Sequence, residues 1–385
     1  MNITDPVLAT GSIATPTTEG VRMTIGPDNP RSRSSGAPRA GAATIYDIAS
    51  LAGVSPSTVS RALNQPGRIS ATTEAKVRAA AEKLDYRANP MARALPTGLT
   101  RTIALVVADI TNPVVFGIVR GAERAAAKAG YTLVISESQE SGEVEAATIE
   151  RIAPAVDGIV LATTRLSDSD IANLASRNKL VMINRQAEGV TSIEPLIRPG
   201  IAELVAHLAD LGHERVAFVG GPAGSWTSAR RWEALLAETR ARALSVVEIG
   251  PNAPTIVGGR AALGQVLASR ATAVVAFNDL MAIGLLQEAR DRGLAVPTAL
   301  SVSGFDDIFG AEFMVPALTT VRVDLAAAGE EAVRALLADI RGGVHSPEGE
   351  ELVSSLVVRG STGRRATSAA TDADADAKTN GAVRA

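Results

Sequence analysis

Residues 44–64 read TIYDIASLAGVSPSTVSRALN, and this stretch predicts two short helices joined by a tight turn. Gly53 supplies the turn between them. Ser55 and Pro56 form a strong start for the second helix, because serine caps free N–H groups and proline at the first helical position loses no hydrogen bond. The apolar positions that face inward are Ile45, Ile48, Ala49, Ala52, Val54, Val59, Ala62 and Leu63.

A third helix is expected over residues 71–84, after the N-cap residue Ser70. Its apolar positions Val77, Ala81 and Leu84 would close a small core. The two helices before it then form a helix-turn-helix motif, whose second helix fits the DNA major groove with its N-terminal residues at base edges. The alternative is a helix-turn-helix that makes only protein contacts.

Beyond residue 100 the pattern changes to short apolar runs that alternate with Ala-rich amphipathic stretches, which predicts β-α-β units. The runs are continuously apolar, so the sheet should be buried on both faces. The expected strands are 102–108, 131–135, 158–161, 180–183, 216–219, 273–277 and 300–304. Helical patterns between them include 115–129, 201–211, 229–243, 280–292 and 325–341.

The predicted fold is therefore an N-terminal all-α helix-turn-helix headpiece followed by an α/β core of two doubly wound parallel-sheet subdomains. Residues 1–43 and 362–385, rich in small and polar residues, are expected to be disordered tails. Residues 44–87 form the headpiece, 88–99 the linker and 100–361 the core. Ligands of such sheets bind beyond the carboxyl ends of the strands.

The composition excludes several classes of protein. The chain contains no Cys, which excludes disulfides, thiolate zinc sites and cysteine nucleophiles and suits a reducing cytoplasm. Its three His are scattered, which disfavours a metal cluster, and we expect no metal and no cofactor. No apolar stretch is long enough for a transmembrane helix, and the N-terminus does not resemble a secretory signal.

Charge is distributed unevenly along the chain. Residues 44–95 carry seven Lys and Arg against four Asp and Glu, whereas residues 96–361 carry a net charge of −8. A small basic segment on a larger acidic body indicates a polyanionic partner for the small segment.

Enzyme motifs are missing from the sequence. We find no Ser-His-Asp context, no metal-ligand spacing and no G-x-x-x-x-G-K loop, and the Gly220-Gly221-Pro222 turn is a weak phosphate signal. A solute-binding receptor without a DNA role is a second alternative, which the complete headpiece disfavours.

The headpiece resembles the DNA-binding region of the lactose/galactose repressor (LacI/GalR) family of transcription regulators. The residues that carry the resemblance are Tyr46-Asp47-Ile48-Ala49, Ala52-Gly53-Val54-Ser55, Thr58-Val59-Ser60-Arg61, Ala62-Leu63-Asn64, Leu84-Asp85-Tyr86 and Asn89-Pro90. With the core included, the resemblance covers about 320 of 385 residues.

The resemblance implies which headpiece residues contact DNA. Pro56, Ser57 and Arg61 correspond to base-reading positions, and Arg can pair bidentately with guanine. Phosphate contacts, which position the protein without reading sequence, are expected from Thr44, Ser55, Thr58, Ser60 and Asn64.

The segment Asn89-Pro90-Met91-Ala92-Arg93-Ala94-Leu95 resembles the family's hinge helix. That helix forms only on DNA, where Leu95 would act as a wedge in the minor groove. A merely flexible linker is the alternative.

From residue 102 to about 361 the chain resembles the family's regulatory core, which is similar to periplasmic sugar-binding proteins, with the chain crossing between subdomains near residues 195 and 321. The landmarks include Asp109-Ile110-Thr111-Asn112-Pro113, Asn278-Asp279 and Gly304-Phe305-Asp306-Asp307. The implied ligand-binding residues are Asp109, Asn112, Phe116, Arg185, Trp226, Arg230, Asn278, Phe305 and Asp306. Asn278 could instead cap the helix that follows it.

The core departs from the family pattern near the pocket. Val114 and Val115 stand where two aromatic residues are frequent, and Asn184 replaces a usual Asp before Arg185. These changes disfavour a standard hexose, and Arg198 near the pocket hints at an anionic ligand.

The resemblance implies a sequence-specific transcription regulator, a repressor, that binds a near-palindromic operator as a homodimer under allosteric control by a small molecule, a sugar or sugar derivative. We expect a cytoplasmic protein without membrane partners, associated with the nucleoid when bound.

Overall fold

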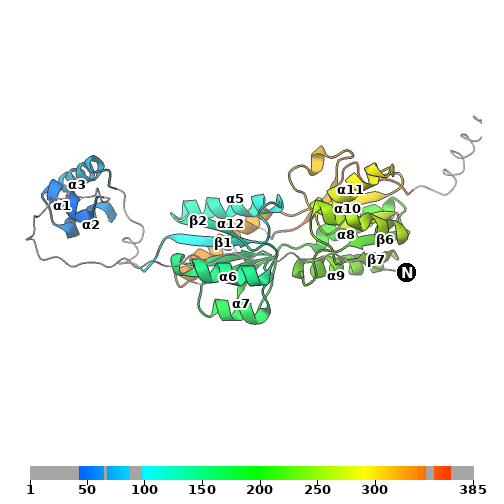
Figure 1. Cartoon of the computed structure of the whole chain (residues 1–385), viewed down its shortest axis with the longest axis horizontal. Helices are drawn as coiled ribbons and strands as arrows, with labels where there is room; N and C mark the ends of the chain where they lie inside the picture. Colours follow the sequence, from blue (N-terminus) through cyan, green and yellow to red (C-terminus); the bar gives the residue numbers. More distant parts are fainter. Residues whose placement is uncertain (1–42, 65–66, 87–97, 344–350, 366–385) are drawn as a thin grey trace, which may run out of the picture. The chain divides into compact units, whose positions relative to one another are not determined.

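In the computed structural model the chain divides into two compact units, Met1–Arg87 and Ala88–Ala385. The structure describes residues 43–64, 67–86, 98–343 and 351–365. Among these described residues, the first unit holds three helices, and the second holds two α/β subdomains (Figure 1). This confirms the predicted fold class.

The headpiece consists of α1 (Ile45–Ala52), α2 (Pro56–Asn64) and α3 (Ala71–Lys83). Gly53 ends α1 with φ of 69°, a left-handed conformation that favours glycine. The Ser55 hydroxyl accepts the Thr58 N–H at 3.2 Å and so caps α2. The helices enclose a small core of Ile48, Ala49, Val59, Ala62, Val77, Ala80 and Ala81.

The first core subdomain contains a parallel five-stranded sheet in the order β2-β1-β3-β4-β5. Its strands are β1 (Thr102–Val107), β2 (Thr132–Glu137), β3 (Ile159–Ala162), β4 (Leu180–Ile183) and β5 (Thr191–Ile193). Its helices are α5 (Val114–Lys128), α6 (Gly142–Ile152), the 3-10 turn η1 (Ala153–Ala155), α7 (Asp168–Ala175) and α12 (Leu325–Ile340).

The alternating side chains of β1 serve two separate cores. Ile103, Leu105 and Val107 belong to the cluster that contains α5 and α12, whereas Ala104 and Val106 pack with α6 and α7. Helices therefore cover both faces of the sheet, as Figure 1 shows, and β1, β3 and β4 are buried almost throughout.

The second core subdomain contains a six-stranded sheet in the order β11-β10-β9-β8-β6-β7, parallel except for β11. Its strands are β6 (Arg215–Val219), β7 (Ser245–Ile249), β8 (Ala273–Ala276), β9 (Ser301–Asp306), β10 (Thr319–Arg322) and β11 (Ser355–Val357). Its helices are α8 (Arg198–Asp210), α9 (Trp226–Ala241), α10 (Ile256–Ala268), α11 (Asp279–Asp291) and the 3-10 turn η2 (Ala311–Phe313).

The chain passes between the subdomains more than once. It leaves the first sheet after Ile193, returns after Arg322 to form α12, and enters the second sheet again at β11. Leu196 and Val353 form a β-bridge, so two of the crossing strands lie side by side. The sequence did not indicate the third passage.

Several elements escaped sequence-based prediction. Strands β5 and β11 have three residues each, and edge strand β7 is largely exposed. None of the three therefore produces a continuous apolar run in the sequence. Helix α10 contains Gly258, Gly259 and Gly264, which lower helix propensity. Also missed were β10, α6 and α7.

The predicted boundary at residue 361 is too early. The Thr362 hydroxyl bonds Thr319 at 2.9 Å, and the Arg365 N–H donates to the Leu211 carbonyl at 2.9 Å. These bonds fasten residues 362–365 to the second subdomain. Within the described ranges, no helix is both long and apolar enough to cross a bilayer.

Helices α5 and α12 pack with their backbones in close contact. A Cβ on Gly121 would come 1.8 Å from the Ala326 carbonyl oxygen, so only glycine allows this approach. Gly264, on the exposed side of α10, has no atom within 4 Å of a built Cβ.

We predict opposite effects of the same substitution at these two glycines. Gly121→Ala should lower the free energy of unfolding by about 1–3 kcal/mol, because the helices must separate. Gly264→Ala should raise it by up to about 1 kcal/mol through helix propensity. Urea unfolding followed by circular dichroism measures both, and equal effects would contradict the close packing.

Candidate functional site

The N-terminus of α2 presents a cluster of hydroxyl groups. The Ser55 Oγ lies 2.8 Å from the Ser57 Oγ and 2.9 Å from the Thr58 Oγ1. Ser55 and Ser57 are exposed, Pro56 and Thr58 half-buried, and the helix N-terminus beside them carries free N–H groups. Such a cluster can donate to phosphate or base acceptors.

Other predicted DNA-contact residues also lie on the surface of the headpiece. Arg61 is exposed and Ser60 half-buried on α2. Thr44 is exposed at the start of α1, where its hydroxyl donates to Asp47 at 2.7 Å in a capping box. Tyr46, which sequence reasoning did not select, is 68% exposed on α1 and adds an aromatic group to this surface.

Three predicted contacts cannot be placed. Asn64 ends α2, but its side chain lies outside the described part of the chain, as do Asn89 and Leu95 altogether.

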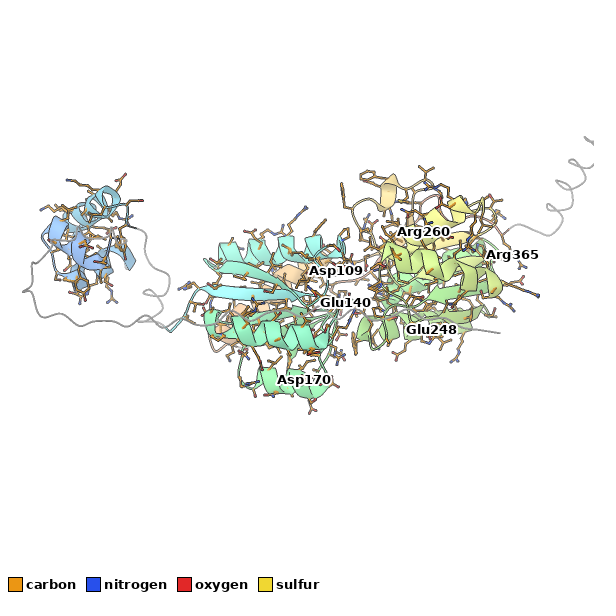
Figure 2. The ribbon with its side chains drawn as sticks, viewed as in Figure 1. Asp109, Glu140, Asp170, Glu248, Arg260 and Arg365 are labelled. Carbon is orange, nitrogen blue, oxygen red and sulfur yellow. The ribbon has the colours of Figure 1, made fainter. Side chains whose placement is uncertain are left out.

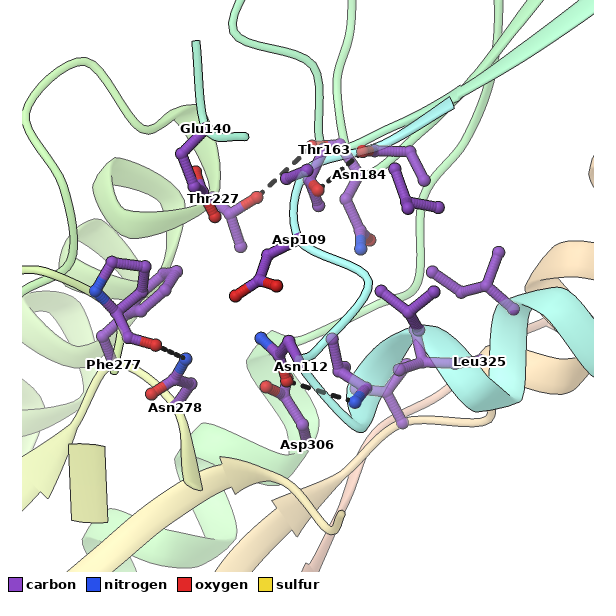
Figure 3. Close-up of a pocket in the computed structure, with 18 of the residues that line it drawn as sticks. Asp109, Asn112, Glu140, Thr163, Asn184, Thr227, Phe277, Asn278, Asp306 and Leu325 are labelled. Atoms are coloured by element: carbon purple, nitrogen blue, oxygen red, sulfur yellow. Dashed lines mark hydrogen bonds between the residues drawn. The ribbon is translucent and has the colours of Figure 1, made fainter. Parts of the chain in front are cut away.

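A pocket lies between the two core subdomains, at the ends of their strands (Figure 3). The first subdomain contributes Asp109, Asn112, Glu140, Thr163, Arg165 and Asn184 to its polar lining, and the second contributes Thr227, Arg231, Asn278 and Asp306. Apolar lining comes from Val107, Ala108, Val114, Val115, Ile118, Ala162, Pro195, Ile197, Pro254, Phe277, Val323 and Leu325. Figure 2 places Asp109 and Glu140 at the end of the first subdomain that faces the second.

The pocket gathers residues with an uncommon backbone. Glu140, Thr163, Asn184 and Asp306 have φ of 58°, 58°, 60° and 107°, in the region that non-glycine residues rarely occupy. Three of them directly follow or end a strand, where the left-handed conformation turns the chain at the pocket. Strain of this kind concentrates at binding sites, so it supports the pocket as a functional site.

Arg231 is the central cation of the pocket. Its guanidinium donates to the Asp306 Oδ1 at 2.7 Å and to the Phe277 carbonyl, and it lies 3.8 Å from the Phe305 ring centroid. The Arg231 Nε is buried and has no hydrogen-bond partner among the described residues. A ligand oxygen could therefore accept from this Nε without breaking an existing bond.

Asp306, which lines the pocket, and Asp279, which lies beneath it, have altered pKa values. Burial raises the pKa of Asp306, and Arg231 partly opposes this rise. Burial and the neighbouring charge of Asp306 hold the pKa of Asp279 well above its usual range. Asp279 accepts from the Thr320 hydroxyl at 2.6 Å and from the Ile308 N–H at 2.9 Å, so it joins α11 to the strand ends that carry Asp306.

Asn278 and Asn112 already have structural partners. The Asn278 Oδ1 caps α11 by accepting from the Met281 N–H at 2.9 Å, and its amide donates to the Pro254 carbonyl at 3.0 Å. The Asn112 Oδ1 accepts from the Val114 N–H at 3.2 Å (Figure 3). Both side chains line the pocket, and each retains an amide proton for a ligand.

The charges of the lining are mostly paired. Arg165 binds Glu140 and donates to the Thr163 carbonyl, and Arg231 binds Asp306. Asp109 has no ion pair within the described residues, and its Oδ1 accepts from the Thr111 N–H and hydroxyl. The pocket therefore offers an unneutralised carboxylate and no unpaired cation among its described residues.

Arg230 and Trp226 do not line this pocket, which corrects the sequence-based assignment. They border a second groove with Glu194, Arg198 and Glu233. Arg230 lies over the Trp226 ring at 5.5 Å. The buried face of α9 carries Ser228, Arg231 and Leu235, so its inward arginine is the one after Arg230.

Phe116, Arg185 and Phe305 also lie outside the lining. Phe116 is 52% exposed on α5, because Val115 and Ile118 occupy the inward face. Arg185 pairs with Asp168 at 2.6 Å, and Phe305 is buried in the core beneath Arg231. Thus Asp109, Asn112, Asn278 and Asp306 are the predicted ligand residues that line the pocket.

Sequence reasoning missed Arg231, Thr227, Glu140 and Thr163. The three- and four-residue spacing of Ser228, Arg231 and Leu235 is the signal that could have identified Arg231. No comparable signal marks Glu140 and Thr163, whose placement depends on the turns after β2 and β3.

Comparisons with known proteins agree with this organisation. Residues 44–89 match the model of bacterial regulatory proteins of the lacI family, and residues 205–362 match a periplasmic binding protein-like domain. The HTH-type transcriptional repressor CytR of Escherichia coli K12 is 33% identical over 332 residues, which cover 83% of this chain and 96% of CytR. The chain belongs to the LacI family.

Other family members match along nearly their whole length. The HTH-type transcriptional regulator MalR of Streptomyces coelicolor is 34% identical over 83% of this chain and 96% of its own. The Lac repressor dimer bound to operator and an anti-inducer matches with a TM-score of 0.76 at 27% identity, covering 84% of this chain and all of that one. A CelR–cellobiose complex matches with a TM-score of 0.61 at 28% identity over 83% and 99%. As a LacI-family protein, the chain is a DNA-binding regulator of transcription.

We predict that two adjacent arginines of α9 respond differently to truncation. Arg231→Ala should lower the free energy of unfolding by about 3–5 kcal/mol, since Asp306 would keep a buried charge without a partner. Arg230→Ala should change it by less than about 0.5 kcal/mol, because Arg230 is exposed. Urea unfolding of both variants checks this. A large effect of Arg230→Ala would show that Arg231 had been wrongly identified as the buried arginine.

Proposed function

We propose that the chain is a repressor that binds a near-palindromic operator as a homodimer and is controlled by a small, uncharged, hydroxyl-bearing effector. The observation that supports this most is the pocket between the subdomains, to which both contribute polar side chains. A ligand that contacts both would favour one angle between them, and such a preference is the basis of allosteric coupling.

The headpiece supplies sequence recognition in this proposal. Arg61 and Ser57 on the exposed side of α2 read base edges, and Pro56 offers apolar contact. Thr44, Ser55, Thr58, Ser60 and Asn64 hold phosphates. Asn89 and Leu95 belong to a hinge that contacts the minor groove, in keeping with the family model that reaches residue 89.

Two arguments support the homodimer. Helix-turn-helix proteins bind two related half-sites with two copies of the motif, and the Lac repressor among the relatives is a dimer. The loop between β9 and β10 offers an apolar surface for it. Phe309, Phe313 and Val315 are 78%, 63% and 90% exposed there, and the two rings lie edge to face at 5.3 Å. Exposed apolar groups in one loop are typical of a contact surface.

The charge balance of the pocket supports an uncharged effector. Asp109 can accept from a ligand hydroxyl, whereas both lining arginines are engaged with carboxylates. Arg198 binds Glu238 at 2.9 Å and borders the second groove, so it does not support the anionic ligand that the sequence hinted at. The CelR relative binds cellobiose, an uncharged sugar.

The activity in this proposal is binding alone, without catalysis, since the named relatives are regulators and repressors. Its place of action is the cytoplasm, on the nucleoid.

We predict that Arg61→Ala weakens binding to the selected operator by about 1–3 kcal/mol and relaxes one position in each half-site. Selection of bound fragments from a random duplex library, with and without the substitution, measures both. Arg78→Ala is the control, since Arg78 is an exposed headpiece arginine on α3 that pairs with Glu74.

The selection from the native chain also tests the proposal itself. A recovered near-palindrome supports a dimeric regulator, whereas fragments without two related half-sites would contradict it. Equal loss on every sequence in the Arg61→Ala variant would show that Arg61 holds a phosphate instead of a base.

We predict that uncharged sugars bind and their phosphate esters do not, measured by calorimetry on matched pairs. Asp109→Asn should weaken the best sugar by about 1.5–3 kcal/mol, because a charged acceptor is lost. Asp168→Asn, a change at an exposed carboxylate outside the pocket, is the control and should have no effect. Tighter binding of a phosphate ester would refute the uncharged effector.

A further inference from the structure

The two edges of the first core subdomain carry opposite charge. The segments at the ends of β1, β2 and β3, residues 108–113, 137–145 and 163–170, include the first turns of α6 and α7 and contain seven acidic residues and one basic residue. The loops that precede β1, β2, β3 and β4, together with the last turns of α5 and α6 and the end of α12, contain six basic residues and three acidic ones. These six are Arg101, Lys128, Arg151, Arg177, Lys179 and Arg341.

Parallel topology brings the six together, because all five strands begin at the same edge of the sheet (Figure 1). Contacts support this placement. Lys179 binds Asp339 at 2.8 Å, and Arg101 lies over the Tyr131 ring at 5.5 Å. Asp339 belongs to the last turn of α12, so the end of α12 reaches this edge.

The acidic groups of this edge are largely engaged. Asp157 accepts from the Thr100 N–H at 2.6 Å and from the Arg101 N–H at 2.9 Å, and Asp339 pairs with Lys179. Lys128, Arg151, Arg177 and Arg341 are exposed and form no ion pair with any described residue. Basic residues also suit helix C-termini, but Arg101 and Lys179 belong to no helix, so helix dipoles alone do not explain the edge.

This is also the edge at which the core is tethered to the headpiece. The Asp157 carboxylate holds Thr100 and Arg101 just before β1. Twelve residue steps separate Tyr86 from Gly98, which limits their separation to about 43 Å whatever the path. When the headpiece is on DNA, the tether keeps this edge at a high effective concentration near the duplex, so even weak phosphate contacts add to binding.

We propose that the basic edge of the first core subdomain is a second DNA-contacting surface that binds backbone phosphates without reading sequence. It rests on the proposed function, since the headpiece must first place the protein on DNA. Phosphate contacts release counterions, so the surface increases affinity and its dependence on salt while leaving specificity to the headpiece.

The test compares two double variants of the full chain by operator binding over a range of salt concentrations. Arg177→Gln/Arg341→Gln removes two unpaired charges from the basic edge. Arg240→Gln/Arg364→Gln removes two exposed charges from the second subdomain and controls for net charge. Each variant is also measured on a scrambled duplex and for effector binding.

The edge variant should bind the operator about 3- to 30-fold more weakly at low salt, with the slope of log affinity against log salt reduced by about 1–2. Its ratio of operator to scrambled affinity and its effector binding should match those of the native chain. The control variant should keep the native slope.

Equal salt slopes for the native chain and the edge variant would overturn the proposed second surface. An equal reduction of the slope in the edge variant and the control variant would also overturn it. A changed operator-to-scrambled ratio would also overturn it, because phosphate contacts carry no sequence information. If the native chain itself fails to prefer the operator over scrambled DNA, the proposed function fails first, and that result is distinct from the others.

Discussion

The pocket depends on one buried ion pair. Arg231 is removed from water between the rings of Phe277 and Phe305, and its charge is tolerable only because Asp306 and the Phe277 carbonyl accept its hydrogens. Asp306 ends β9 with an uncommon backbone, Asp279 lies beneath it, and α9 must present the correct face. The pair thus fixes the relative positions of α9, α11 and the end of β9, and with them the second subdomain's half of the pocket.

The other half of the pocket is built differently. Glu140, Thr163 and Asn184 follow β2, β3 and β4. Arg165 binds Glu140, and the Arg165 N–H donates to the buried Glu145 at 2.9 Å. Burial raises the pKa of Glu145, so this half also contains a carboxyl group whose charged form is disfavoured. The Thr227 hydroxyl reaches the Asn184 carbonyl at 3.5 Å, a weak direct bond between the halves. An effector placed between them would therefore add contacts to both halves at the pocket.

Periodicity and caps were enough to predict the headpiece, the parallel sheets and most long helices, because each depends on residues within a few positions. The errors have a common cause. The sequence pattern places Arg230 in the helix but does not determine which side of that helix faces inward, and Arg231 is the inward residue. Phe116 follows Asn112-Pro113 in the sequence, but its side chain lies on the outward face of α5. Glu140 and Thr163 join the pocket only through tertiary placement. Asn278 lines the pocket, and its cap bond to Met281 shows that a structural role and a place in the pocket can coexist.

The discontinuity of the first subdomain has a consequence for synthesis. The headpiece is complete by residue 86 and can fold as it leaves the ribosome. The first sheet must wait for α12, whose backbone fits against α5 at Gly121 and Gly329 and which is made after most of the second subdomain. At a translation rate of about 5–20 residues per second, the α5 surface waits about 10–40 s for its partner. During that interval the nascent chain exposes the apolar side of α5, and a chaperone is best placed to act on it then.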